Sequence, residues 1–175
     1  MRPISMALLL VCLIASDAMA EEQSLMIAHS GSWVTFEHRP SGIALPNVCY
    51  TASIGQNITV FLRSGSNHDF EIRLANDAWS LPSHAAGEVS FKIGDWGVPL
   101  QAVSNGATML DVYITEQFME TFIDHMDNGS SMSVTVGNSP AVRFSLAGST
   151  RATNAFRTCA GLTGNAPIPG GNPFN

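Results

Sequence analysis

The feature that most constrains this fold is a two-residue alternation of apolar and polar side chains, repeated in six segments. Successive side chains of a strand point to opposite faces, so each segment predicts a strand with one buried face and one wet face. Parallel strands are covered on both faces and read as continuous apolar runs, so the alternation favours antiparallel pairing. The apolar sets are Ile58, Val60 and Leu62; Phe70, Ile72 and Leu74; Val89, Phe91 and Ile93; Leu110, Val112 and Ile114; Met132, Val134 and Val136; and Val142, Phe144 and Leu146.

The segments between these strands contain turn-forming residues. Residues 64–67 (Ser-Gly-Ser-Asn) and 137–140 (Gly-Asn-Ser-Pro) each separate two alternating segments and predict hairpin loops. Two weaker strands are predicted at Trp33–Glu37 and Val48–Ser53. We expect residues 21–30 to be loose, and we expect a flexible tail over residues 163–175, which are rich in Pro, Gly and Asn.

Two segments have a helical period instead. The apolar residues of Thr115–Met126 lie on one stripe, with Thr115 as the predicted N-cap and Gly129 as part of the stop signal. A second helix is predicted over Thr150–Ala160, with Ser149 as its cap. These patterns predict the α+β class: a mostly antiparallel β-sheet or sandwich with two short helices in the C-terminal half.

The first twenty residues have the layout of a secretory signal peptide. Arg2 precedes an apolar core from Met6 to Ala15, and Ala18-Met19-Ala20 is a small-x-small cleavage signal. The apolar core has about ten residues, whereas a bilayer span needs about 20. We therefore expect a periplasmic or secreted protein with no stable membrane insertion after cleavage. The alternative is a retained membrane anchor. Residues 21–162 are expected to form a single domain.

Removal of residues 1–20 leaves two cysteines, Cys49 and Cys159. An even pair in an exported chain is typical of a disulfide, because disulfides form and persist outside the reducing cytosol. Cys159 lies on the buried stripe of the second predicted helix. We predict that the bridge staples this helix to an early strand. The alternative is two separate buried thiols.

Composition excludes one class of partner. The chain has 8 basic and 14 acidic residues and a formal net charge of -6. Proteins that bind nucleic acid carry a basic patch or stripe, so we expect no nucleic-acid partner.

No motif for catalysis, metal binding or a cofactor occurs in the chain. There is no Gly-x-Ser-x-Gly elbow and no phosphate-binding loop. We therefore predict no catalytic residues, no metal and no cofactor. The alternative is a small hydrolase or metal-dependent enzyme assembled from separated His, Asp and Ser residues. The five histidines lack the close spacing of a metal motif: His29, His38, His68, His84 and His125.

Charged residues form two groups, one on a predicted strand and one on the first predicted helix. Asp69, Glu71 and Arg73 share one strand face, with Arg63 as a candidate neighbour. They form either a charged binding face or ordinary cross-strand ion pairs on a wet surface, and we favour the second. The other group is predicted to be the solvated face of the first helix: Glu116, Glu120, Asp124 and Asp127.

The last third of the chain resembles a known type of exported protein. A strand leads into the helix Thr115–Met126, then Asn128-Gly129, the strand Met132–Val136, the run 144–149 and a helix that ends at Cys159. Over residues 88–160 this order is similar to small exported proteobacterial proteins of the invasion-associated locus B type and to related periplasmic domains of unknown function. The resemblance implies a bacterial envelope protein with a β-rich fold and no known catalytic apparatus.

Trp79 and Trp96 are the candidate partner-binding residues. Both lie in predicted connecting segments, which often carry function, and Trp is enriched at binding hot spots. In the alternative interpretation, each ring folds back onto the core. We therefore expect a non-enzymatic module that binds another envelope or secreted protein, as an inhibitor, an immunity-type factor or a secretion accessory. A binder of cell-wall carbohydrate is a further alternative.

Overall fold

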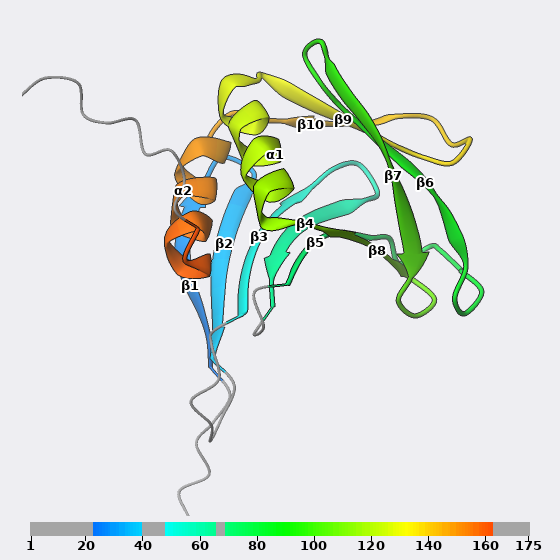
Figure 1. Ribbon diagram of the computed structural model, residues 1–175, viewed down its shortest axis with the longest axis horizontal. Helices are drawn as coiled ribbons and strands as arrows, with labels where there is room; N and C mark the ends of the chain where they lie inside the picture. The colour runs from blue at the N-terminus through cyan, green and yellow to red at the C-terminus, as the bar shows by residue number, and fades with distance from the viewer. Residues whose placement is uncertain (1–22, 40–47, 66–68, 163–175) are drawn as a thin grey trace, which may run out of the picture.

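The computed structural model describes residues 23–39, 48–65 and 69–162 and contains a ten-stranded sheet and two helices (Figure 1). In chain order the elements are β1 (Gln23–Ser30), β2 (Trp33–Arg39), β3 (Val48–Ile54), β4 (Thr59–Ser64), β5 (Phe70–Ala75), β6 (Ala86–Ile93), β7 (Trp96–Ser104), β8 (Met109–Ile114), α1 (Glu116–Asn128), β9 (Ser131–Val136), β10 (Val142–Ser145) and α2 (Ser149–Ala160).

All strand pairs of this sheet are antiparallel, which confirms the predicted α+β class. The spatial order is β1-β2-β3-β4-β5-β8-β7-β6-β9-β10, so it is a single sheet rather than a two-sheet sandwich. The six alternating segments form β4, β5, β6, β8, β9 and β10. Strand β8 pairs with β5, and the β6–β7 hairpin extends the sheet from β8 toward β9.

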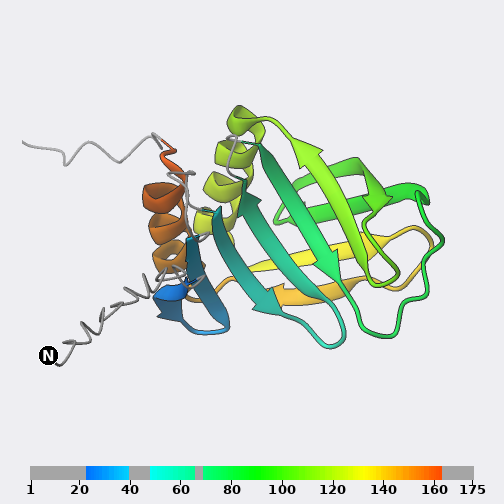
Figure 2. The same cartoon turned by 90° about the horizontal axis from the view of Figure 1, so that it is seen from below.

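The sheet curls around its own apolar face, so the core lies on the inside of the curl (Figure 2). The curl brings β10 close to the start of β2, where Trp33 Nε1 donates a hydrogen bond of 2.8 Å to the Ser145 carbonyl. A Cβ added at Gly55, after β3, would lie 2.8 Å from the Phe144 ring. Strands at opposite ends of the spatial order therefore pack against one core.

Helix α1 packs its apolar stripe against this core, as predicted. The Thr115 side chain caps it by accepting a hydrogen bond of 3.2 Å from the Phe118 backbone N–H. Phe122 meets Phe91 of β6 edge to face, with the ring centroids 5.3 Å apart. Aromatic pairs in this geometry add to the stabilisation from buried area. The other buried residues of the stripe are Met119, Ile123 and Met126.

Helix α2 lies beside β1, β2 and β3 (Figure 1), and the Cys49–Cys159 disulfide joins it to β3. The predicted staple is therefore confirmed. The prediction of Ser149 as the cap is wrong. Gly148 is the N-cap residue, with φ 87°, and Ser149 is the first helical residue, whose hydroxyl donates to the Met126 carbonyl at 3.4 Å. The Ser149 hydroxyl, which the local sequence predicted as the helix cap, instead makes a hydrogen bond between the two helices.

The expectation of a loose segment over residues 21–30 is wrong for most of that range. Residues 23–30 form β1, which pairs with β2 along its length, with a register shift between Met26 and Ala28. Consecutive exposed apolar side chains interrupt the alternation in β1, so the sequence did not predict a strand there. Backbone hydrogen bonds to β2 hold this segment in place instead. The predicted signal peptide at 1–20 and tail at 163–175 lie outside the described residues. Neither α1 nor α2, the helices of the described ranges, is long and apolar enough to cross a membrane.

Candidate functional site on the outer face of the sheet

The face of the sheet that points away from the core carries two adjacent rows of aromatic and charged residues. Residues directly opposite each other on antiparallel strands project from the same face, so the pairing register defines the rows. Neither α1 nor α2, the helices of the described part, covers this face of β4 and β5 (Figure 2). The first row, from β3 to β8, is Tyr50, Arg63, Glu71 and Tyr113; the second, from β4 to β7, is Phe61, Arg73, Asp111 and Val103.

Two carboxylates are buried beneath the surface of this face. Asp111 is 0 % exposed and Glu71 is 2 % exposed. Arg73 binds Asp111 in a bidentate fashion, with Nε 2.7 Å from Oδ1 and Nη2 2.9 Å from Oδ2, and Asn105 Nδ2 donates to Oδ2 at 2.7 Å. The cross-strand ion pairing favoured from sequence is present, but the prediction of a wet surface is wrong, because neighbouring side chains exclude water from both carboxylates. Asp69 itself is exposed.

Glu71 has weaker partners than Asp111. Arg73 Nη2 lies 2.9 Å from Glu71 Oε1, and Arg63 Nη1 lies 3.3 Å from Oε2. Within the described residues, the buried Oε1 has no partner with hydrogen-bond geometry. Burial raises the pKa of Glu71 above its ordinary value, and the negative charge of Asp111 adds to this; the attraction of Arg73 and Arg63 is smaller than these effects combined. Glu71 is therefore a charge held at some cost beneath two guanidinium groups.

Aromatic side chains lie around the two arginines. Tyr50 Oη accepts a hydrogen bond of 3.4 Å from Arg63 Nε, and the Arg63 guanidinium carbon lies 5.8 Å from the centroid of the same ring. Tyr113 is 63 % exposed, and Phe61 is half-buried. The site therefore presents guanidinium groups held in place from below and aromatic surfaces open to a partner. Arg, Tyr and Phe are enriched in protein interfaces.

Sequence reasoning singled out Arg63, Glu71 and Arg73 but missed the other members of this face. Tyr113 and Phe61 occupy polar-face positions of alternating segments. An aromatic residue at a position that should be wet is the signal that could have found them. Asp111 could not be found in this way, because β5 and β8 become neighbours only in the folded sheet.

Trp79 and Trp96, the two tryptophans predicted to bind a partner, lie near opposite ends of β7. Trp79 is half-buried in the β5–β6 loop, and that loop bonds to the β7–β8 turn through Leu81 N–H and the Ala107 carbonyl, at 2.9 Å. The prediction that Trp96 lies in a loop is wrong. It is the first residue of β7, because the turn between β6 and β7 is shorter than the sequence suggested. Its ring stacks on His125 of α1 with centroids 4.4 Å apart. Partner binding through Trp79 and Trp96 stays a prediction.

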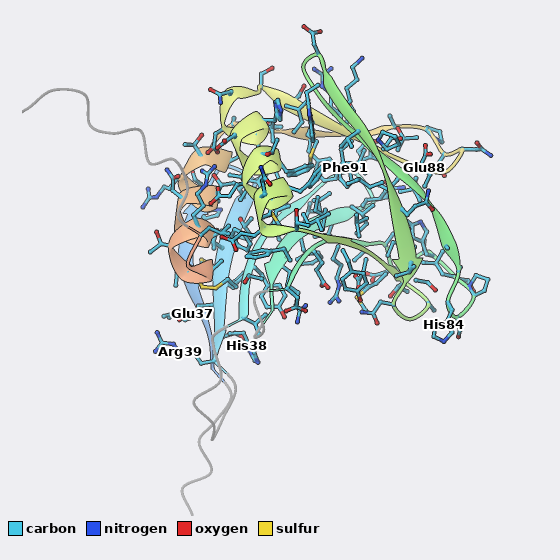
Figure 3. All side chains as sticks on the ribbon, in the orientation of Figure 1. Glu37, His38, Arg39, His84, Glu88 and Phe91 are labelled. Carbon is cyan, nitrogen blue, oxygen red and sulfur yellow. A yellow bond between two sulfur atoms is a disulfide. The ribbon has the colours of Figure 1, made fainter. Side chains whose placement is uncertain are left out.

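The described histidines are scattered over the structure. His38 of β2 and His84, just before β6, lie well apart along one edge of the view (Figure 3), and the His125 ring stacks on Trp96. His68 lies outside the described residues. Within residues 23–39, 48–65 and 69–162, no three His, Cys, Asp or Glu side chains could hold a metal ion together.

The acidic stripe of α1 is only in part the solvated face that we predicted: Glu116 and Asp124 are exposed, but Glu120 and Asp127 are half-buried. Arg157 of α2 reaches three of its carboxylates: Nε is 2.9 Å from Glu120, Nη2 is 2.6 Å from Asp124, and Nη1 is 2.7 Å from Asp127. The two helices are separated by β9 and β10 in the chain, so the local pattern of α1 contained no sign of this partner. The stripe therefore has a structural role between the helices.

Comparison with known proteins agrees with the fold. No protein-family model and no curated protein sequence matches the chain. The chain is structurally similar to the crystal structure of invasion associated protein B from Bartonella henselae, with a TM-score of 0.50 and 12% sequence identity over 77% of this chain and 97% of that chain. The resemblance seen in the sequence is thus confirmed as a distant likeness of fold.

Proposed function

We propose that this chain is a non-enzymatic domain of the bacterial envelope that binds another protein through the outer face of its sheet. The observation that carries the proposal is the uncovered face formed by Tyr50, Phe61, Arg63, Arg73 and Tyr113. We call these five residues the outer-face patch. A role as an inhibitor, an immunity-type factor or a secretion accessory would use such a patch.

The energetics of the patch favour association. Burial of one aromatic side chain removes about 150–250 Å² from water, and such residues dominate many interfaces. The two guanidinium groups are already held by Glu71 and Asp111, so they lose little side-chain entropy when a partner binds. Val103, 39% exposed, adds apolar surface at the β7 end of the second row.

The proposed location rests on two features. The first twenty residues have the layout of an export signal. The Cys49–Cys159 disulfide suits an oxidising compartment such as the periplasm or the extracellular space. The expected partner is therefore another envelope or secreted protein.

Site-specific photo-crosslinking in the native cell tests the patch. A photoreactive amino acid at Val103 is expected to give one reproducible protein adduct, and the same probe at the exposed Thr121 of α1 is expected to give none. Tyr113→Ala should abolish the Val103 adduct, because Tyr113 is the most exposed member of the patch.

Trp79→Ala is the matched control for the alternative surface and should leave the Val103 adduct unchanged. The exposed Tyr113 can be removed without opening the core, and far-UV circular dichroism checks this. If the Val103 adduct is absent, or if it survives Tyr113→Ala, the outer-face patch is not the binding surface.

A further inference from the structure

A second site lies at the other end of the sheet, between the end of α1 and the outer face of β6, β9 and β10. Here the structure contains a cleft of about 500 Å³ lined by Lys92, Gly94, Asn128, Gly129, Ser130, Ser131, Ser133 and Arg143. Clefts of roughly 300–1,000 Å³ hold small ligands. The lining contains two cations, hydroxyl groups and no carboxylate, although the protein as a whole is acidic.

The pairing register places the two cations on either side of one serine. Lys92 of β6 is opposite Ser133 of β9, and Ser133 is opposite Arg143 of β10. The three side chains therefore project from the same face, and the two cations are two strand spacings apart, about 10 Å at the backbone. On the far side of Lys92 the opposed residue is Gly97, which adds no side chain to crowd the lysine.

Lys92 and Arg143 form no ion pair with a carboxylate of the described residues. Of the basic residues in the described ranges, Arg39, Arg63, Arg73 and Arg157 are bound to carboxylates. Lys92, Arg143 and Arg151 are the described basic residues that make no ion pair, and the first two share this cleft. Arg143 Nη2 donates to Ser131 Oγ at 2.8 Å, which orients its guanidinium along the same face.

Close packing brings the wall of the cleft into place. Gly129 ends α1, and a Cβ added there would lie 2.5 Å from Ile93 Cγ2 and 2.9 Å from Leu146 Cδ1. Only a glycine lets the chain pass this close to β6 and to the residue after β10. The segment 128–130 is thereby held over the row of Lys92, Ser133 and Arg143.

We propose that this cleft binds a phosphate group. Two cations match a doubly charged tetrahedral anion, and the hydroxyls of Ser130, Ser131 and Ser133 can donate hydrogen bonds to its oxygens. The C-terminal end of α1 carries a partial negative charge, which opposes any anion. Binding therefore depends on the two cations and the serine hydroxyls, and a carboxylate, with one charge and two oxygens, would engage them less fully than a phosphate. The phosphate could belong to a lipid headgroup or to a soluble phosphate ester.

An NMR titration of the purified protein with inorganic phosphate, at constant ionic strength, tests the proposal. Saturable shifts are expected at the backbone amides of Lys92, Ser131, Ser133 and Arg143. Lys92→Gln and Arg143→Gln should each weaken binding about tenfold, because each removes one charge-assisted hydrogen bond. Arg151→Gln is the matched control: it removes an exposed unpaired arginine outside the cleft and should leave the affinity unchanged.

Three results would overturn the site: shifts that do not saturate, equal affinities in wild type and both cleft variants, or acetate binding as tightly as phosphate. Vesicles containing phosphatidic acid, compared with glycerol phosphate, identify the source of the phosphate. Co-sedimentation that needs Lys92 and Arg143 supports the site with a lipid headgroup. Binding of glycerol phosphate without co-sedimentation supports it with a soluble ester. The test is independent of the outer-face patch, since Tyr113→Ala should leave phosphate binding intact.

Discussion

At the scale of single residues, the outer face depends on how buried carboxylates are compensated. Asp111 receives donors from both Arg73 and Asn105, whereas Glu71 keeps one buried oxygen without a hydrogen bond among the described residues. Burial of a carboxylate with incomplete partners costs free energy. It favours the neutral, protonated form and so raises the pKa of the carboxyl group. Glu71 should therefore be a position where pH acts on folding.

Glu71→Gln should change the pH dependence of stability. The pKa of Glu71 is raised in the folded protein, so the folded state binds its proton more tightly than the unfolded chain does. This contribution to stability is fully present below the unfolded pKa, about 4.3, and is lost as pH rises through the higher folded pKa. Urea unfolding of both proteins across this range should show that the free energy of unfolding of wild type falls relative to that of Glu71→Gln. Parallel curves would contradict the shift.

Arg157→Ala should destabilise the protein by roughly 2–4 kcal/mol. It leaves Glu120 and Asp127, both largely buried, without their cation, and breaking a buried pair costs about 3–5 kcal/mol before allowance for partial exposure. Arg151→Ala, on the exposed side of the same helix, should stay within about 0.5 kcal/mol of wild type. Urea denaturation measures both variants. Equal stabilities would show that Arg157 does not join the helices.

At the scale of elements, the local signals predicted each helix well and its neighbours poorly. Thr115 caps α1 and Gly161 ends α2, because capping depends on residues close in the chain. The start of α2 differs because Gly148 lies against Ser30 of β1, more than a hundred residues earlier. The junction between β10 and α2 is thus shaped by a contact that local sequence cannot show.

Gly148→Ala should be much more harmful than Gly106→Ala. Both glycines have left-handed backbone, with φ 87° and 80°, so alanine costs each about 1–2 kcal/mol. At Gly148 the new Cβ would also lie 2.7 Å from the Ser30 carbonyl oxygen, whereas at Gly106 it meets nothing within 4 Å. The clash should add about 1–3 kcal/mol, measured as a lower midpoint of thermal or urea unfolding. Similar midpoints for the two variants would mean that β1 can shift away from residue 148 at no cost in stability.

At the scale of the whole molecule, the disulfide and the curl of the sheet join the two ends of the chain. Cys49 and Cys159 are 110 residues apart in sequence, so the bridge closes most of the domain into one loop. Trp33 and Ser145, at the two ends of the sheet, make a further link. The core therefore depends on contacts between the first and last parts of the chain.

Replacement of both cysteines by alanine should lower stability by about 4–5 kcal/mol, because the unfolded chain regains the entropy that a loop of this length removes. Urea unfolding should show an earlier midpoint and a steeper dependence on denaturant, since the unfolded state becomes more extended. Reductant should shift the wild type toward the variant and leave the variant unchanged. A midpoint that does not move would show that the bridge contributes nothing to folding.

The sequence by itself determined most elements of this protein: six alternating strands, two amphipathic helices and a cysteine pair that could be assigned because only two remain after the predicted signal peptide. These features follow from side-chain periodicity and local capping, which act within a few residues. Tertiary structure decided the strand neighbours that no short turn joins, such as β5 with β8 and β6 with β9. It thereby placed Asp111 beside Arg73, Lys92 and Arg143 on either side of Ser133, and Arg157 against α1. Each candidate site includes one strand pair between distant parts of the chain, β5 with β8 in the first and β6 with β9 in the second, and periodicity carries no information about such pairing.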